Sequence, residues 1–318
     1  MAINRRRFLQ NTSVLASALA LGACGGELIK GPAGRGKVDL LGSYWTIAGG
    51  AIPHAGPEYS PFDFRDRVEA LSRGGFTGMG IWHADLEHIL KSYSHADMKR
   101  ILDDNGIEHL ELEFLLNWFV YGDKRRESDE QRKLLLTAAE KLGARHVKVG
   151  DFYNTEVDMD QLIREWGILC DDGANAGALI LFEAMPFAMV STMEDTLTML
   201  EGANRNNGGI IMDTWHMAKM GVSNDYIANF PSRYLLGVEI NDGYLKTPDG
   251  LTMGEEAYKA RLFPGEGEFD VEGFVDAVQR NGYDGPWGVE VLNTEYRKWP
   301  LKRLVNHSYD TAMKVITA

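Results

Sequence analysis

From residue 37 onward, eight short apolar runs alternate with amphipathic segments that have the period of a helix. Such runs are typical of parallel strands buried on both faces, because these strands carry apolar side chains at successive positions. The expected strands cover residues 38–44, 78–82, 109–115, 146–150, 178–183, 209–213, 235–240 and 287–292.

The segments between these runs carry signals that end helices. Helices are expected over residues 61–73, 128–142 and 270–281, and each is followed by a glycine, which is common after the last turn of a helix. Eight strand–helix units in about 280 residues match the size and rhythm of a (β/α)8 TIM barrel, an α/β fold in a single domain. A doubly wound open sheet is the alternative, but no glycine-rich phosphate-binding loop follows the first expected strand.

The start of the chain has the features of a targeting segment that is removed from the mature protein. Three arginines at residues 5–7 precede an uncharged run over residues 11–23, which is too short to span a bilayer of roughly 30 Å. Residues 1–24 resemble a twin-arginine signal peptide that ends in a lipobox, with Cys24 as the lipidated first residue of the mature chain. Plain cleavage at a small residue and a chance arginine triplet are the alternatives.

This interpretation predicts an exported, periplasmic protein that is anchored to the membrane only through the lipid on Cys24. The glycine-rich residues 25–36 would form a flexible tether, and residues 37–318 the barrel.

The charge balance limits the partners of the chain. Its 318 residues include 33 Lys and Arg against 46 Asp and Glu, a net charge of −13, and loss of the three signal arginines makes it −16. Nucleic-acid binding depends on basic side chains that neutralise phosphates, so nucleic acid is excluded as the main partner. A small-molecule enzyme and a protein-binding module remain, and the sequence leaves the oligomeric state open, including a homodimer.

The last four expected strands each deliver a carboxylate near their carboxyl ends. In a barrel these ends form one rim, which is where the active sites of such barrels lie. Like charges that converge there repel one another unless a cation neutralises them. The pattern predicts one divalent metal ion, with Mn²⁺ or Mg²⁺ favoured and Zn²⁺ or Co²⁺ as alternatives if an imidazole takes part. The alternative for each acid is to cap a helix or pair with an arginine. The four acids are Glu183, Asp213, Glu239 and Glu290.

The order of these acids, the Asp-Thr-Trp-His run at residues 213–216 and the Phe-Pro-Gly-Glu-Gly run at residues 263–267 resemble the xylose isomerase-like TIM-barrel superfamily. The resemblance covers residues 37–318 of this chain. The superfamily includes sugar epimerases, inosose dehydratases, dehydroshikimate dehydratases and endonuclease IV. It implies that Glu183, Asp213 and Glu290 are metal ligands and that His216 lies near the substrate.

One position departs from the family pattern. Related epimerases usually carry a histidine ligand three residues before an aspartate of strand 7, and Glu239 stands three residues before Asp242 here. Glu239 is expected to bind the metal as a fourth carboxylate. The alternatives are that His216 becomes the ligand or that metal binding is weakened or lost.

Four further residues are candidates for substrate binding. Arg261 lies in a loop where the related epimerases carry a substrate-binding arginine. His83 follows the second expected strand, where it would reach a sugar hydroxyl or have no task. Glu113 and Lys148, near the ends of strands 3 and 4, would contact the substrate or pair with each other inside the barrel.

The chemistry that fits this site is proton transfer next to a carbonyl. Glu183 and Glu290 would act as acid and base on opposite faces of the substrate, and the metal would stabilise the enediolate. Epimerisation, isomerisation and dehydration share this first step. Because an exported enzyme meets few phosphorylated sugars, a free ketose, keto-sugar or glycoside is the expected small-molecule carbohydrate substrate.

An isomerase or epimerase is therefore the main prediction. A keto-sugar dehydratase or lyase on the same site is one alternative, and a non-catalytic carbohydrate-binding lipoprotein is another. The endonuclease branch is excluded because the chain lacks a histidine cluster and is acidic.

Overall fold

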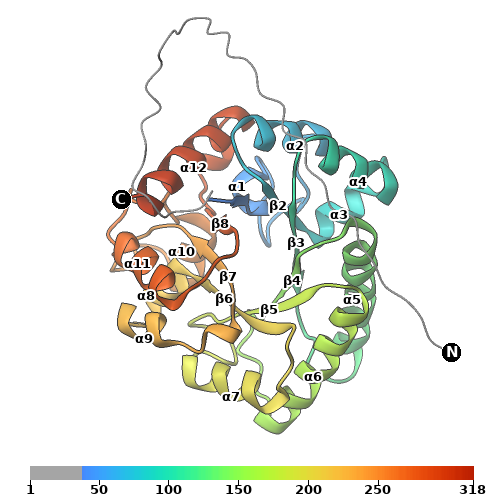
Figure 1. The fold of residues 1–318 in the computed structure, drawn as a ribbon, viewed down its shortest axis with the longest axis vertical. Helices are drawn as coiled ribbons and strands as arrows, with labels where there is room; N and C mark the ends of the chain where they lie inside the picture. The colour runs from blue at the N-terminus through green and yellow to red at the C-terminus, as the bar shows by residue number, and fades with distance from the viewer. Residues whose placement is uncertain (1–37) are drawn as a thin grey trace, which may run out of the picture. The chain divides into compact units, whose positions relative to one another are not determined.

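The computed structural model describes residues 38–318, and the predicted signal peptide, Cys24 and the tether up to residue 36 lie outside the described residues. Eight parallel strands close into a barrel in chain order, with β8 paired to β1 (Figure 1). This confirms the predicted single-domain (β/α)8 barrel. The strands are β1 (Leu40–Gly42), β2 (Gly78–Trp82), β3 (His109–Leu115), β4 (His146–Val149), β5 (Leu179–Glu183), β6 (Gly208–Asp213), β7 (Leu235–Ile240) and β8 (Trp287–Val289).

Helices surround the barrel (Figure 1). Within the described residues, no helix is both long and apolar enough to cross a membrane. The helices are α1 (Tyr44–Ile47), α2 (Phe64–Arg73), α3 (His83–Ile89), α4 (His95–Asp104), α5 (Asp123–Leu142), α6 (Met159–Asn175), α7 (Met193–Ala203), α8 (Thr214–Lys219), α9 (Asn224–Asn229), α10 (Met253–Lys259), α11 (Val271–Asn281) and α12 (Leu301–Ile316), with 3₁₀ turns η1 (Ser232–Tyr234) and η2 (Tyr296–Lys298).

The predicted helix ends agree better with the structure than the predicted starts do. Helices α5 and α11 are followed directly by Gly143 and Gly282, which both adopt the left-handed conformation that glycine tolerates best. Helix α5, however, starts at Asp123, five residues before the predicted start. Ser128 has the chemistry of a helix cap, but its hydroxyl instead donates to the carbonyl of Leu116 at 2.6 Å.

The interior of the barrel holds ionisable side chains as well as apolar ones. Glu113 of β3 and Lys148 of β4 are paired in register and are both buried. Earlier on the same two strands, His146 Nε2 lies 2.7 Å from Glu111 Oε2. Buried charges need partners close by, and each of these side chains has one.

Candidate functional site

Four buried carboxylates meet at the carboxyl ends of β5 to β8. Glu183 and Asp213 end β5 and β6, Glu239 lies one residue before the end of β7, and Glu290 directly follows β8. Each offers an oxygen atom, and these four atoms all lie within 4.8 Å of one another. The structure thus brings together the four acids that the strand pattern singled out. We refer to Glu183, Asp213, Glu239 and Glu290 as the carboxylate cluster.

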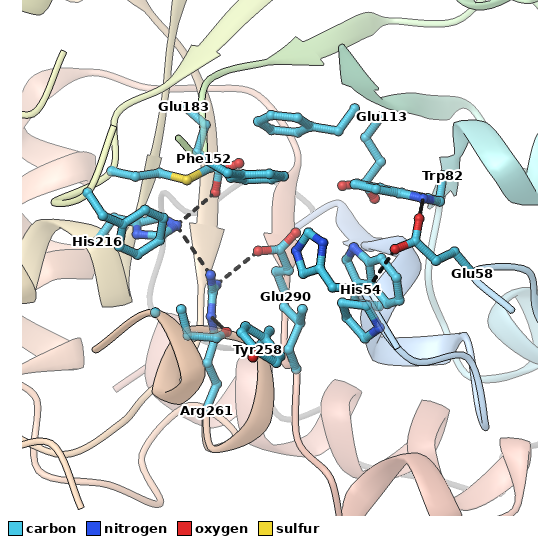
Figure 2. A pocket seen from close by; sticks show the side chains of 18 residues that line it. His54, Glu58, Trp82, Glu113, Phe152, Glu183, His216, Tyr258, Arg261 and Glu290 are labelled. Carbon is cyan, nitrogen blue, oxygen red and sulfur yellow. Dashed lines mark hydrogen bonds and ion pairs between the residues drawn. The ribbon is translucent and has the colours of Figure 1, made fainter. Parts of the chain in front are cut away.

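Arg261, in the loop after α10, contacts two members of the carboxylate cluster, and Figure 2 shows its contacts with Glu290 and His216. Its Nη1 donates to Asp213 Oδ2 at 3.0 Å and to Glu290 Oε2 at 2.9 Å. Its Nη2 lies 3.2 Å from His216 Nε2, and its Nε donates to the carbonyl of Ala257. Burial opposes the charge of Arg261, but Asp213 and Glu290 outweigh this and raise its pKa, so the guanidinium is cationic.

Asp213 also performs the helix-capping task that was the alternative for each acid. Its Oδ1 accepts from the backbone N–H of His216 at 3.0 Å, which caps α8, and its Oδ2 accepts from Asn241 Nδ2 at 2.5 Å. Burial lowers the pKa of His216 to about 3, so this imidazole is neutral near pH 7. With Arg261 donating to His216 Nε2, the ring proton is placed on Nδ1, which has no hydrogen-bond partner among the described residues.

Lys148 is the second cation among the acids. Its Nζ lies 2.7 Å from Glu290 Oε1, 3.0 and 3.1 Å from the two oxygens of Glu239, and 3.0 Å from Glu113 Oε2. The side chain is completely buried. Burial lowers the pKa of an ammonium group, but the surrounding carboxylates outweigh it and raise the pKa of Lys148 well above its usual value. Lys148 therefore pairs with Glu113, as the alternative prediction had it, and with two members of the cluster.

The environment moves the pKa values of two cluster acids in opposite directions. Burial raises the pKa of Glu183 to about 7. Burial also acts on Glu290, but Lys148 and Arg261 outweigh it and lower the pKa of Glu290 to about 2. Next to the cluster, burial raises the pKa of Glu113 to about 8. Perturbed carboxyl groups that face one pocket are a mark of acid–base sites.

The carboxylate cluster has the ligand types for a divalent cation and one oxygen atom without a hydrogen-bond donor. Glu183 Oε1 is buried and accepts no hydrogen bond from the described residues. His216 Nε2 lies 3.2 Å from it, but this nitrogen accepts from Arg261 and has no proton to donate. Such an oxygen is costly unless another group completes the site. Oxygen ligands suit Mg²⁺ and Mn²⁺, and the adjacent imidazole of His216 extends the range to Zn²⁺, so the residues present fit a divalent ion.

A pocket of about 260 Å³ lies over the carboxylate cluster (Figure 2). Glu113, Glu183, His216, Arg261 and Glu290 line it, whereas Asp213, Glu239 and Lys148 are not among its lining side chains. His83 lines an adjoining groove instead, and burial lowers its pKa to about 4.

Much of the pocket wall is aromatic, and Trp45 and Trp82 in it follow or end expected strands. Trp45, Trp82, Phe114, Phe152, Phe187 and Tyr258 take part in it. Glu58 also lines the pocket and accepts a hydrogen bond from Trp82 Nε1 at 3.1 Å (Figure 2). Phe152 and Phe187 lie in loops, where no hydrophobic period marks them.

Comparison with known proteins places these features in context. Residues 68–314 match the family described as xylose isomerase-like TIM barrel. A 3-dehydroshikimate dehydratase of Pseudomonas aeruginosa is 29% identical over 246 residues, which are 74% of this chain and 37% of that protein. An inosose isomerase of Bacillus velezensis is 22% identical over 80% of this chain and 92% of that protein. The chain thus spans little more than a third of the length of the dehydratase.

Solved structures show the same fold. The structure of the IolI protein with a bound zinc atom has a TM-score of 0.76 and 19% identity, over 88% of this chain and 98% of that one. A D-psicose 3-epimerase from Clostridium cellulolyticum has a TM-score of 0.62 and 17% identity, over 80% and 94%.

Proposed function

Because the chain belongs to the xylose isomerase-like TIM barrel family, we propose that it is a metal-dependent isomerase or epimerase of an uncharged keto-sugar or its glycoside. The observation that carries the proposal is the pair Glu183 and Glu290, which line one pocket with pKa values moved in opposite directions. The relatives include an inosose isomerase, a dehydratase and, among solved structures, a sugar epimerase.

In this proposal Glu183 moves the proton. Its carboxyl group has a pKa of about 7, near the pH at which a general base or acid works best, and its Oε1 has no donor among the described residues. Glu290 is held by Lys148 and Arg261 and stays ionised at neutral pH. It would receive or return a proton on the other face of the substrate, so that the two acids together permit inversion or transfer to the next carbon.

The carboxylate cluster would hold the metal ion chiefly through Glu183, Asp213 and Glu290. A divalent ion there would stabilise the negative charge that develops on the substrate oxygen as the proton leaves. The zinc atom bound in the IolI structure supports a divalent metal in this fold.

The lining of the pocket favours an uncharged substrate. Arg261 is the one Lys or Arg side chain among the described residues that line it, and four of its five N–H groups are used by Asp213, Glu290, His216 and Ala257. A carboxylate or phosphate on the substrate would therefore meet the acids without a free cation. Aromatic side chains, by contrast, suit the apolar faces of sugar rings.

A groove large enough for a second group adjoins the pocket. The groove, of about 620 Å³, shares His54, Glu58, Trp82 and Phe152 with the pocket, and Tyr153 also lines it. No Lys or Arg among the described residues lines it. The shared lining of the pocket and the groove supports a glycoside over a free ketose, because the second sugar or aglycone would lie in the groove. The export signal predicted from residues 1–24 would likewise bring the enzyme to unphosphorylated sugars.

Dehydration of a keto-sugar is the second candidate. The 29% identical relative is a dehydratase, and loss of a β-hydroxyl begins with the same proton abstraction. The lack of a free cation among the described residues of the pocket argues against the carboxylate-bearing substrate in that relative's name, and an uncharged keto-sugar avoids this conflict.

Solvent deuterium separates these reactions. The purified protein, loaded with Mn²⁺, is incubated in D₂O with a panel of free ketoses and 3-keto-glycosides, and the products are followed by NMR. An isomerase or epimerase incorporates deuterium and conserves mass otherwise, whereas a lyase releases water or the aglycone. If no sugar in the panel exchanges a proton with wild-type protein, the proposed function is wrong.

A further inference from the structure

Lys148 brings a full positive charge into the interior of the barrel. Its ammonium group is buried among Glu113, Glu239 and Glu290, at 2.7 to 3.1 Å from their oxygens. A buried charge of this kind is stable only with a close and well-oriented counter-charge. The question is which carboxylate supplies it.

Glu113 and Glu290 have other partners and face the pocket. Glu290 shares its second oxygen with Arg261, and Glu113 Oε1 accepts from the backbone N–H of Tyr44 at 3.1 Å. Both line the pocket, where a substrate or ion reaches them. Neither is reserved for Lys148.

Glu239 is committed to Lys148. Both of its oxygens accept from Lys148 Nζ, and Oε1 also accepts from Ser43 Oγ at 2.7 Å. Burial and the neighbouring Glu290 raise the pKa of Glu239. Lys148 and Ser43 act in the opposite direction, because their donors on both oxygens favour the ionised carboxylate. Glu239 has no exposed surface and does not line the pocket.

The backbone beside Glu239 is shaped to keep it in place. A Cβ atom on Gly288 of β8 would lie 2.7 Å from Glu239 Cγ, so only glycine lets the side chain pack against this strand. Ser43 Oγ, which donates to Glu239 Oε1, would lie 3.4 Å from the same Cβ atom. The side chain is therefore held with its carboxylate aimed at Lys148.

We propose that Glu239 is the counter-ion of Lys148 rather than a metal ligand, and that this neutral pair positions Glu290 and sets the charge of the metal site. With Lys148 and Glu239 balanced, the ionised forms of Glu183, Asp213 and Glu290 would carry three negative charges against one on Arg261. The remainder matches one divalent ion. The inference rests on the proposed function for the metal, and it assigns Glu239 a different role from the ligand that the sequence predicted.

Metal affinity distinguishes a counter-ion from a ligand. Titration calorimetry with Mn²⁺ alone is applied to wild type, Glu239→Gln, Lys148→Met and the double variant. Glu239→Gln leaves the lysine charge unbalanced and weakens binding roughly tenfold or more. Lys148→Met adds net negative charge and leaves binding as tight or tighter. The double variant returns to within about threefold of wild type, since neither charge remains. A double variant as weak as Glu239→Gln would overturn the proposal, because a lost ligand is not restored by removing a lysine.

The unfolding temperature of the metal-free protein tests the pair without metal. Each single substitution should lower Tm by roughly 6 to 15 °C, and the double variant by clearly less than the sum. Additive shifts would overturn the proposal. If wild type binds no Mn²⁺, the metal in the proposed function fails, and this cycle still decides the pairing. If Lys148→Met does not fold, Lys148→Gln takes its place in both experiments.

A buried acid elsewhere in the chain provides the control. Asp85 pairs with buried Arg67 at 2.7 Å, outside the carboxylate cluster. Asp85→Asn should lower Tm in a similar way and leave Mn²⁺ affinity within about threefold of wild type.

Discussion

The two sides of the carboxylate cluster differ in how completely protein donors use their oxygens. On the side of β7 and β8, Glu239 and Glu290 have donors on both oxygens, from Lys148, Ser43 and Arg261. On the side of β5, Glu183 Oε1 has no donor among the described residues, and its Oε2 is 3.9 Å from Lys148 Nζ. We call the side of Glu239 and Glu290 saturated, and the side of Glu183 open.

This difference separates the pKa values of Glu183 and Glu290, whereas burial and the neighbouring Glu290 raise the pKa of Glu239 despite its donors. Donors on Glu290 favour its charged form and lower its pKa to about 2, whereas burial without donors raises that of Glu183 to about 7. A carboxylate with donors on both oxygens is held in place, and an open one is available to substrate, metal and proton. The saturated side therefore holds the geometry, and the open side carries the acid–base group whose pKa is about 7.

The largest expected effect comes from the open side. Glu183→Gln should lower kcat by roughly 10²- to 10⁴-fold while the protein remains folded, because it removes the proton-transfer group and one of the three proposed metal ligands and leaves the ion pairs of Lys148 and Arg261 with Glu290 in place. Deuterium exchange into the substrate measures it. Glu111→Gln, a buried acid paired with His146 inside the same barrel, is the matched control and should retain activity within about tenfold. Full activity of Glu183→Gln would contradict the assignment of the two sides.

Removing the arginine that bridges Asp213 and Glu290 should cost stability. Arg261→Met leaves Asp213 and Glu290 without a cation, and we expect the free energy of unfolding in urea to fall by about 3 to 5 kcal/mol. Arg205→Met removes an exposed pair with Asp171 and should cost at most about 1 kcal/mol. Equal losses in the two variants would show that burial does not distinguish these arginines.

The third effect is a pH dependence of stability that belongs to Glu183. Its pKa rises from 4.5 to about 7 on folding, so the folded state binds its proton more tightly than the unfolded state does. The resulting stabilisation is present below about pH 4.5 and is lost as the pH rises through about 7. Urea unfolding of metal-free wild type and Glu183→Gln should show wild type losing roughly 2 to 3 kcal/mol relative to the variant between pH 4.5 and 8. A difference that is constant with pH would contradict the raised pKa.

The strand pattern was sufficient to predict the barrel and the convergence of four acids, because parallel strands in chain order place their carboxyl ends on one rim. The saturation of one side was not predictable in the same way. Lys148 lies 91 residues from Glu239 and 142 from Glu290, and only closure of the barrel brings β4 opposite β7 and β8. A lysine in an apolar run was the signal, and its alternative interpretation as a partner of Glu113 was the one the structure shows.

The smallest expected effect lies outside both sides of the cluster, on the groove. Tyr153 lines the groove but not the pocket, and its ring is more than half exposed. If a second sugar or aglycone stacks there, Tyr153→Ala should raise KM for a 3-keto-glycoside by about fivefold, equivalent to roughly 1 kcal/mol, and leave kcat unchanged. KM for a free ketose should not change, because its ring occupies only the pocket. Tyr121→Ala, which removes another exposed tyrosine that lines neither cavity, should alter neither value. An equal rise in KM for both substrates would place the effect of Tyr153 in the pocket and remove the support that the groove gives to a glycoside.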